Sequence, residues 1–282
     1  MIKLILVYLN GGLGNQLFQY AHAKSLASDR TKIILKTSNY LRIFQIFKRN
    51  TPRHPSLLKL INIEKKNIFN KNFYLYEFFF SFWKKIKEKQ PFIFQKIIID
   101  NKNIKLIGYW QSYKYFKDIK HDLYKEIYLD NIYKIKNDSK FQLINKCNSV
   151  SIHVRRGDYV NNKITNKFHG LMGPDYFKKA IKIMRQQISR PIFFVFSDDI
   201  NWCKDEFGNH FHYIDPDEKN DSTVKDFLLM ISCRNFIISN SSFSWWAAYL
   251  SSNKKKTVIS PKYWINNFNE TSDLIPSNWI KL

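Results

Sequence analysis

The strongest constraint on the fold is an alternation of short strand-like runs with amphipathic helical segments. Ser149–Val154 is rich in β-branched residues and Ile192–Phe196 is apolar throughout, as is typical of buried strands. Between them, Pro174–Ile188 repeats apolar residues at helical spacing, and Pro174 suits the first turn of a helix. This strand–helix–strand order predicts an α/β fold in which mostly parallel sheets carry helices on both faces.

The same two patterns recur through most of the chain. Further strands are expected at Ile2–Tyr8, Lys32–Lys36, His212–Ile214, Phe236–Ile238 and Thr257–Ile259, and further helices at Asn15–Ala27, Ser222–Cys233 (with Ser222 as the N-cap) and Phe243–Leu250. Residues 38–105 show weak periodicity and no motif. A length of 282 residues suggests two domains at roughly 150 residues each, and we place the boundary between residues 146 and 147.

The cysteines and the apolar runs limit where such a chain can work. Three scattered cysteines, an odd number, argue against a disulfide scaffold and a zinc cluster and fit a reducing compartment. No apolar run approaches the roughly 20 residues that span a bilayer. The apolar start of the chain runs directly into glycines, so we interpret it as a first strand rather than a signal peptide.

The charge of the chain is strongly positive and unevenly placed. The net charge is +23, and residues 1–146 carry 28 Lys and Arg against 10 Asp and Glu, whereas residues 147–282 carry 18 against 13. A basic first half suits nucleic acid, an anionic membrane surface or a phosphorylated substrate. The abundance of Asn, Ile, Phe and Tyr beside Lys also fits AT-rich coding. The aromatic run 78–83, followed by Lys84 and Lys85, suits either a membrane interface or a core.

The first expected strand ends in a glycine-rich turn. In parallel sheets, ligands bind beyond the carboxyl ends of the strands. Gly11, Gly12 and Gly14 lie at that position before a helix, where free N–H groups favour anions. Leu17 replaces the third glycine of the dinucleotide fingerprint, and no acid follows the second strand, so a nicotinamide or flavin site is not expected. A tight turn with only a packing role remains the alternative.

The segment after Ser149–Val154 carries the strongest chemical signal. Arg155 and Arg156 are followed by Gly157 and Asp158. The planar fork of arginine suits phosphate oxygens, and two such forks would neutralise a diphosphate without a metal ion. The plainer alternative is an Arg–Asp surface pair, which contributes less than about 1 kcal/mol.

Three further strand ends carry polar residues with two interpretations each. Asp198 and Asp199, after Ser197, suit a metal or a base, but this strand end also suits the N-cap of the next helix. Asp215 and Asp217 form an Asp-x-Asp motif inside a polar turn. The serine cluster at 239–244 precedes a helix, where it predicts either a phosphate nest or a simple N-cap. No pair of histidines has metal-ligand spacing on a helix.

Four segments together resemble one family. They are Gly11-Gly12-Leu13-Gly14-Asn15-Gln16-Leu17-Phe18-Gln19-Tyr20-Ala21, His153-Val154-Arg155-Arg156-Gly157-Asp158-Tyr159, Phe196-Ser197-Asp198-Asp199 with Trp202 after it, and Asn240-Ser241-Ser242-Phe243-Ser244-Trp245-Trp246-Ala247-Ala248. In order and spacing they are similar to the α-1,2-fucosyltransferases of glycosyltransferase family 11. The resemblance implies a GT-B-like fold of two Rossmann-like α/β domains facing across a cleft. It makes 1–146 the acceptor-side domain and 147–282 the GDP-fucose-binding domain.

The resemblance also implies a reaction. L-Fucose would pass from GDP-β-L-fucose to the 2-hydroxyl of a terminal galactose with inversion, giving an α-1,2 linkage without a metal or other cofactor. Arg155 and Arg156 would stabilise the charge on the leaving β-phosphate, and Asp158 would act as the base or orient the arginines. The donor-binding residues that it implies are Gly12, Gly14, Asn15, His153, Arg155, Arg156, Asp226, Ser241, Ser242 and Phe243.

Other functions stay open on the sequence alone. They are the transfer of another nucleotide sugar on the same scaffold, a metal-dependent transferase using Asp215 and Asp217, and nucleic-acid binding, which leaves the four segments unexplained. The expected acceptor is a β-galactoside, including a lipid-linked O-antigen unit at the inner membrane face. A cytoplasmic enzyme would then make peripheral contact with the membrane through Lys84, Lys85, Lys87 and Lys89. Nucleic acid is not an expected partner, and the oligomeric state is left open.

Overall fold

The computed structural model divides into two compact units. It describes residues 2–37, 54–69, 80–100, 102–157, 160, 166–167, 169–215, 222–266, 268 and 270–282. Unit 1 comprises Met1–Leu123 with Ser272–Leu274, and unit 2 comprises Tyr124–Thr271 with Ile275–Leu282. The division follows Leu123 rather than residue 146, because helix α5 (Ser139–Lys146) packs on α10 and β6 of unit 2. The acceptor-side and donor-binding roles of the two domains stay predictions.

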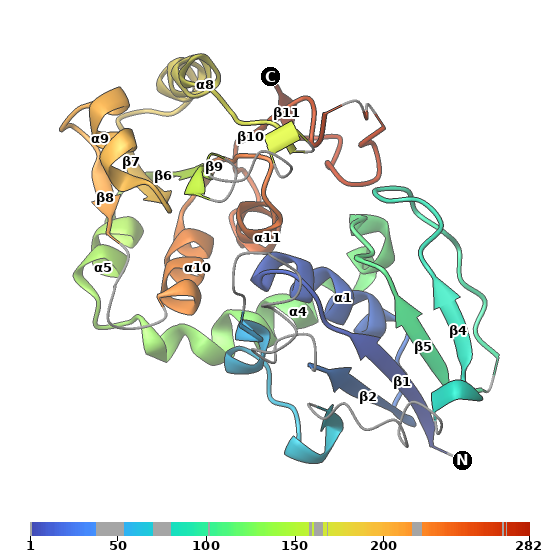
Figure 1. The fold of residues 1–282 in the computed structure, drawn as a ribbon. Coiled ribbons are helices and arrows are strands. Elements are labelled where there is room, and N and C mark those ends of the chain that lie inside the picture. The colour runs from blue at the N-terminus through green and yellow to red at the C-terminus, as the bar shows by residue number, and fades with distance from the viewer. Residues whose placement is uncertain are drawn as a thin grey trace. The chain divides into compact units, whose positions relative to one another are not determined.

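Unit 1 is built on a parallel sheet of five described strands. Their order is β3-β2-β1-β5-β4, with β1 in the centre (Figure 1). The bounds are β1 Lys3–Tyr8, β2 Thr31–Lys36, β3 Ile68–Phe69, β4 Lys84–Lys87 and β5 Ile104–Ile107. Helix α1, Leu13–Ser25, follows β1 and packs against it. The described part of this unit also contains the short 3-10 turns η2 Ser56–Lys59, η3 Lys65–Asn67, η4 Tyr113–Tyr115 and η5 Lys117–Ile119.

The core of unit 1 explains why some of its strands were predictable. Ile5, Leu6 and Val7 of β1 are all buried, so that strand has a continuous apolar run. In contrast, β4 exposes its lysines and buries Ile86 alone, so its sequence carries no strand pattern. Strand β4 lies within residues 38–105, where the sequence showed only weak periodicity, and β5 begins at the end of this stretch.

The aromatic run at 78–83 divides between core and surface. Phe78 and Phe79 lie outside the described residues. Phe80 is buried and makes edge contacts with Phe69 and Trp83, with ring centroids 5.8 and 4.9 Å away. Phe82 is exposed. The core interpretation therefore holds for Phe80, whereas the membrane interpretation of Phe82 stays a prediction.

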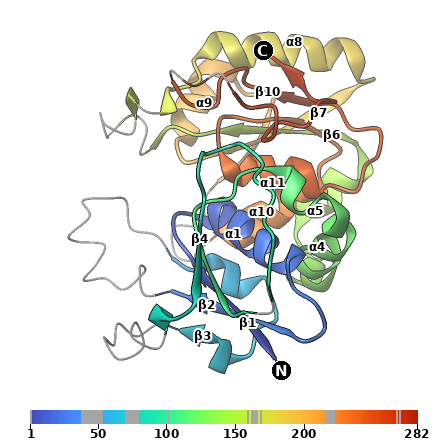
Figure 2. The ribbon, with the colours of Figure 1, turned by 90° about the vertical axis from the view of Figure 1, so that its right-hand side faces the viewer.

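Unit 2 is a parallel sheet between two layers of helices. The described strands follow the order β11-β10-β9-β6-β7-β8. Their bounds are β6 Asn148–Val154, β7 Pro191–Ser197, β8 His212–Ile214, β9 Asn235–Ile237, β10 Val258–Ser260 and β11 Ile280–Lys281. Helix α8, drawn in yellow, covers one face of this sheet, and α10 and α11 lie on the other (Figure 2).

Three helices of unit 2, α8, α10 and α11, lie where the sequence predicts them, whereas no bounds were predicted for the others. Their bounds are α8 Pro174–Gln187, α9 Ile200–Phe207, α10 Thr223–Ser232 and α11 Ser242–Leu250, and α4 (Lys120–Ile127) and η6 (Leu129–Lys134) precede them. Pro174 lies in the first turn of α8, as predicted. Ser222 occupies the N-cap position of α10, but its side chain does not cap the helix. Its hydroxyl donates instead to Asp226 Oδ2 at 2.8 Å.

Each sheet reverses its strand order at one point. In unit 2 the chain runs from β6 to β7 and β8, and then returns to place β9 on the other side of β6. In unit 1 the chain runs from β1 to β2 and β3, and then places β5 on the other side of β1. Such reversals open a crevice at the carboxyl ends of the two flanking strands, where α/β proteins bind ligands.

The predicted fold class is confirmed as two α/β units with parallel sheets, of the Rossmann-like kind expected for a GT-B-like chain. The cleft expected between the two domains concerns their relative placement and stays a prediction.

Candidate active site

Two arginines and two aspartates form an ion-pair network at the carboxyl end of the unit 2 sheet. Arg155 and Arg156 follow β6, and Asp198 and Asp199 follow β7, its neighbour in the sheet. Arg155 Nη1 lies 2.6 Å from Asp198 Oδ2, and Arg156 Nε lies 2.9 Å from Asp199 Oδ2. The backbone N–H of Arg156 also donates to Asp198 Oδ1 at 2.8 Å. The four side chains are half-buried, so these pairs are screened less than surface pairs.

Helix α9 fixes the orientation of the second arginine. Asp199 accepts a hydrogen bond from the backbone N–H of Trp202 at 3.2 Å and thereby caps α9, as predicted. The Arg156 guanidinium lies over the Trp202 ring, 4.1 Å from its centroid. A cation held on both its edge and its face has little rotational freedom. Arg156 is therefore pre-oriented before any ligand binds.

Asp198 holds the turn that follows β6. Burial raises the pKa of this carboxyl, but Arg155 and the backbone N–H groups of Arg156 and Gly157 lower it more, so the net pKa is below its ordinary value. A Cβ added at Gly157 would lie 2.9 Å from Asp198 Oδ2. Glycine at this position therefore allows the carboxylate to approach the backbone.

The first residue of the predicted site on β6 is a buried, neutral histidine. His153 Nδ1 and Ser239 Oγ are 2.9 Å apart, and the His153 ring lies 5.6 Å from that of Phe243. Burial lowers the pKa of His153 to about 3, with Asp198 opposing and Arg155 reinforcing the effect. At neutral pH this imidazole therefore binds through hydrogen bonds and ring contact, without charge.

The segment after β9 places a helix N-terminus at the same end of the sheet. Ser241 is the N-cap of α11, and Ser241, Ser242 and Phe243 are each half-buried. Asn240 is buried and anchors the turn, because its amide donates to the carbonyl oxygens of His169 and Trp264 at 2.7 and 3.2 Å. The structure thus brings the arginine motif and the serine cluster to the ends of adjacent strands.

Of the two further acidic predictions, Asp226 and Asp158, the structure describes only Asp226. Asp226, on α10, is half-buried and accepts from Ser222 as described above. Its helix adjoins α11, since Phe227 and Phe243 are 5.2 Å apart. Asp158 lies outside the described residues, so its assigned roles are untested.

The Asp-x-Asp motif has no metal-site geometry on its described side. Asp215 is exposed, with Lys204 Nζ 3.8 Å from its Oδ1, and Asp217 lies outside the described residues. In the part of the chain that the structure describes, no three His, Cys, Asp or Glu side chains are grouped to hold a metal ion.

The second group of predicted residues lies at the reversal point of unit 1. Gly11 has φ +76°, and a Cβ there would lie 2.5 Å from Asn15 Nδ2, so this position requires glycine. Gly12 is the N-cap of α1 with open space around its Cα, whereas Gly14 is buried in the helix. Asn15 Oδ1 accepts from Gln111 Nε2 at 2.8 Å.

Residues after β5 complete this loop and were missed by sequence reasoning. Tyr109 OH accepts from Asn10 Nδ2 at 3.2 Å. Glu88 accepts from the backbone N–H groups of Tyr109 and Trp110 at 2.8 and 2.9 Å, although burial raises its pKa. The only available signal was topological, because β5 was not recognised as a strand beside β1.

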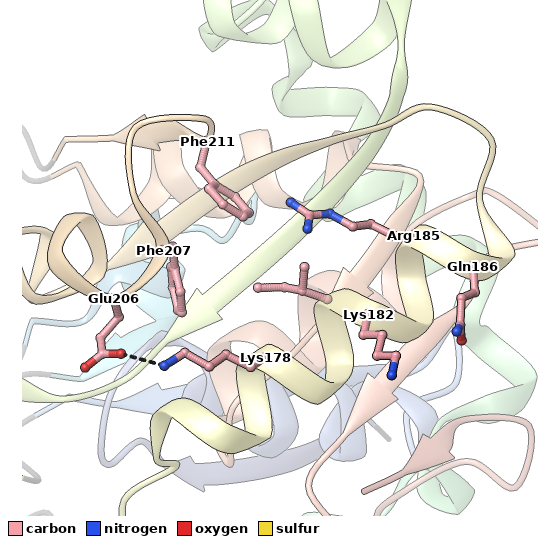
Figure 3. A pocket seen from close by; sticks show the side chains of 8 residues that line it. Lys178, Lys182, Arg185, Gln186, Glu206, Phe207 and Phe211 are labelled. Atoms are coloured by element: carbon pink, nitrogen blue, oxygen red, sulfur yellow. Dashed lines mark ion pairs between the residues drawn. The ribbon is translucent and has the colours of Figure 1, made fainter.

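A hollow of about 410 Å³ lies elsewhere on unit 2 (Figure 3). Its aromatic side chains are Phe207 and Phe211, and its cations include Lys182 and Arg185. Lys178 in its wall pairs with Glu206 at 3.3 Å. None of the predicted site residues lines it.

Comparison with known proteins places the chain in a family. Residues 1–282 match glycosyl transferase family 11, so the chain belongs to this family of glycosyltransferases. The predicted family and enzyme class are confirmed.

The relatives of this chain include glycosyltransferases named for the sugar or the glycan on which they act. The chain is 31% identical to an alpha-1,2-colitosyltransferase of Escherichia coli over 100% of this chain and 99% of the relative. It is 28% identical to the O-antigen biosynthesis glycosyltransferase WbnK of Escherichia coli, over 97% and 99%. Among solved structures, fucosyltransferase NodZ from Bradyrhizobium is 14% identical, with a TM-score of 0.47 over 88% of this chain and 92% of that one. Within the described residues, no helix is long and apolar enough to cross a membrane.

Proposed function

We propose that this enzyme transfers L-fucose from GDP-β-L-fucose to the 2-hydroxyl of a terminal galactose, with inversion and without a metal ion. The observation that carries the proposal is the set of groups at the carboxyl ends of the adjacent strands β6 and β9. Two arginines held by aspartates follow β6, and the N-terminus of α11 follows β9, at the position where α/β sheets bind nucleotides.

The leaving group explains the need for this arrangement. As the bond to the fucose anomeric carbon breaks, negative charge grows on the β-phosphate. Arg156 uses its Nε for Asp199, so its terminal nitrogens are the groups that a phosphate would take. Preorganised donors of this kind contribute roughly 3–4 kcal/mol each to transition-state stabilisation. Asp198 and Asp199 keep the forks in place without removing the charge of the guanidinium groups.

The neutral histidine suits the nucleoside rather than the phosphates. His153 and Phe243 present ring surface, and Ser239 fixes the His153 ring. Asp226 is proposed to bind the guanine. Gly12, Gly14 and Asn15 are proposed to contact the sugar diphosphate, with Gly12 the best placed of the three for close approach.

The proton of the attacking hydroxyl needs an acceptor. Asp158 is the proposed general base, and an oxygen of the leaving phosphate is the alternative acceptor. In either case the hydroxyl attacks from the face opposite GDP, which gives the α-linkage from the β-linked donor.

The acceptor is proposed to be a β-galactoside of an O-antigen unit, linked to lipid at the cytoplasmic face of the membrane. The similarity to an O-antigen biosynthesis glycosyltransferase supports a surface-glycan acceptor. The uneven basic charge of residues 1–146 is compatible with work at an anionic surface.

The similarity to a colitosyltransferase supports a second candidate donor. Colitose is fucose without the 3-hydroxyl. A site built to bind that hydroxyl rejects the deoxysugar strongly, whereas a site that leaves it unbound discriminates weakly.

The deciding experiment measures GDP release from GDP-fucose in excess EDTA, with and without lactose. Galactoside-stimulated release in EDTA is the expected result, and mapping of the product should give an α-1,2 linkage. Loss of turnover in EDTA that added metal restores would replace this proposal with a metal-dependent mechanism. Turnover only with nucleotide-activated colitose would keep the scaffold and change the donor.

A further inference from the structure

Three large apolar side chains are exposed at one edge of unit 1. Phe82 is 79% exposed, Ile98 75% and Ile2 54%. Ile2 directly precedes β1, and Phe82 lies two residues before β4. Large apolar side chains that gather on a surface mark contact with a partner or a membrane, whereas single ones need no explanation.

Hydrogen bonds tie the segments that carry these residues together. The strands β1, β5 and β4 are adjacent and parallel, so their amino ends share one edge of the sheet. Asn103 lies just before β5. Its side-chain Oδ1 accepts from the backbone N–H of Leu4 at 2.9 Å, and its backbone carbonyl oxygen accepts from the backbone N–H of Lys84 at 3.1 Å. Asp100, two residues after Ile98, pairs with Lys84 at 2.9 Å.

Lysines surround the apolar side chains. Lys3, Lys84 and Lys102 all act on Asp100, and the pKa of that carboxyl is lowered chiefly by its hydrogen bond to Lys84. Lys85 is exposed on β4 beside them. We name this surface the amino-edge patch; its members are Ile2, Lys3, Phe82, Lys84, Lys85, Ile98 and Lys102. One carboxylate against four ammonium groups leaves the patch positive.

We propose that the amino-edge patch is a membrane-binding surface, which places Phe82 and Ile98 among the headgroups of an anionic bilayer and its lysines against the lipid phosphates. Aromatic and aliphatic side chains beside lysines are the composition of interfacial anchors. Each lysine near an anionic surface strengthens binding about five-fold. The patch supplies a location for the membrane contact that the proposed function requires, but binding itself needs neither donor nor acceptor.

The structure revises the lysine set expected from the sequence. Lys84 and Lys85 belong to the patch, whereas Lys87 lies at the carboxyl end of β4 and Lys89 lies beyond that end.

The basic face of α8 differs from the patch. There, Phe207 and Phe211 are only half-exposed in the walls of the hollow in Figure 3, so that face lacks protruding apolar groups.

The test is flotation of the full chain with vesicles of mixed phosphatidylglycerol and phosphatidylcholine, compared with phosphatidylcholine alone. The wild type should bind the anionic vesicles and be released at about 0.5 M NaCl, where charges are screened within a few Å. Phe82→Ser with Ile98→Ser should weaken binding about ten-fold. Lys85→Gln with Lys102→Gln should weaken it by about five-fold per lysine.

The matched control is Lys178→Gln with Lys182→Gln on α8, which removes the same charge from unit 2. It should change vesicle binding less than two-fold, which is small beside the effect of about five-fold that we expect for each lysine of the patch. All variants are first compared by thermal unfolding, so that a misfolded variant is not scored.

Equal losses in the control and patch variants would overturn the proposal, as would equal binding to neutral vesicles or no binding at all. So would concentration-dependent dimerisation that Phe82→Ser abolishes, because the patch would then bind a second copy. An enzyme inactive on galactosides that still binds vesicles would refute the proposed function alone.

Discussion

The two units share a topology but place different chemistry at the points where their strand order reverses. In unit 2, the ends of β6 and β7 carry two arginines and two aspartates paired in a network. In unit 1, the loops after β1 and β5 carry glycines, amides and a phenol. Asn15 bonds to Gln111 there, and Asn10 bonds to Tyr109.

This difference teaches what each reversal point is suited to bind. Charged forks recognise phosphate oxygens and stabilise charge as it develops. Amides and phenols exchange hydrogen bonds with hydroxyl groups and carry no net charge. The contrast supports the nucleoside diphosphate at unit 2 and the hydroxyl groups of the sugars at unit 1, in line with the domain roles predicted from the sequence.

The largest effect should come from the charged side of this contrast. Arg155→Ala should lower kcat about 100- to 1000-fold, because a preorganised donor to the leaving phosphate is lost. Steady-state GDP release measures it, with Arg185→Ala at the hollow in Figure 3 as the control. A near-normal rate in Arg155→Ala would remove the phosphate assignment.

The next effect tests whether the aspartates position the arginines. Asp198→Asn should lower kcat about 10- to 100-fold, because Arg155 loses its charged partner while the donor still binds. The split between kcat and KM measures this, since a purely structural loss would instead lower the unfolding temperature. Asp205→Asn, an exposed change on α9, is the matched control.

Two glycine substitutions compare the reversal points directly. Gly157→Ala should lower kcat about ten-fold, because its Cβ would displace Asp198, which lies 2.9 Å away. Gly12→Ala meets nothing within 4 Å, so it should leave the unfolding free energy unchanged and raise KM several-fold through a clash with bound substrate. An unchanged KM in Gly12→Ala would mean that no substrate approaches the Gly12 backbone.

The smallest expected effect concerns one buried histidine in each unit. Burial lowers the pKa of His22 and of His153 to about 3. Between pH 6.5 and 3 the unfolded chain therefore binds protons that the folded chain does not. Above pH 6.5 the two histidines should not reduce the free energy of unfolding. Below pH 6.5 this free energy should decrease as the pH is lowered, by about 1.4 kcal/mol per pH unit for each histidine.

Urea unfolding at pH 7 and pH 5 measures this dependence. His22→Phe keeps the contact with Trp110 and Tyr115 and should flatten the curve for unit 1. His153→Asn should flatten it for unit 2. A slope unchanged in both variants would show that other groups control the acid sensitivity.

The predictability of each part followed burial. Strands such as β1 and β6 were predicted because both faces are buried and their residues are apolar or β-branched. The edge strand β4 buries only Ile86 and exposes three lysines, so its sequence lacks the apolar pattern by which a strand is recognised. The division after Leu123 differs from the boundary predicted at residues 146 and 147, because helix α5 packs on α10 and β6 and local sequence does not record such packing.

The site was predicted as separate motifs rather than as a network. The sequence located Arg155, Arg156 and the serine cluster, and it offered Asp198 and Asp199 as a metal site, a base or a helix cap rather than as partners of the arginines. The pairing of Arg156 with Asp199 spans 43 residues and depends on β6 and β7 being neighbours. Gln111 and Tyr109 were missed for the same reason, because they follow a strand that the sequence did not reveal.

The parallel sheet of unit 1 also fixes the distance between the amino-edge patch and the glycine loop. Its six-residue β1 separates the amino-edge patch from the glycine loop by roughly 20 Å, at about 3.3 Å per residue. With the patch resting on a bilayer, the glycine loop stands that far above the headgroups. Such an enzyme would reach a galactose at the tip of an extended lipid-linked glycan and pass over one held close to the membrane. It would then select acceptors by their length as well as by their terminal sugar.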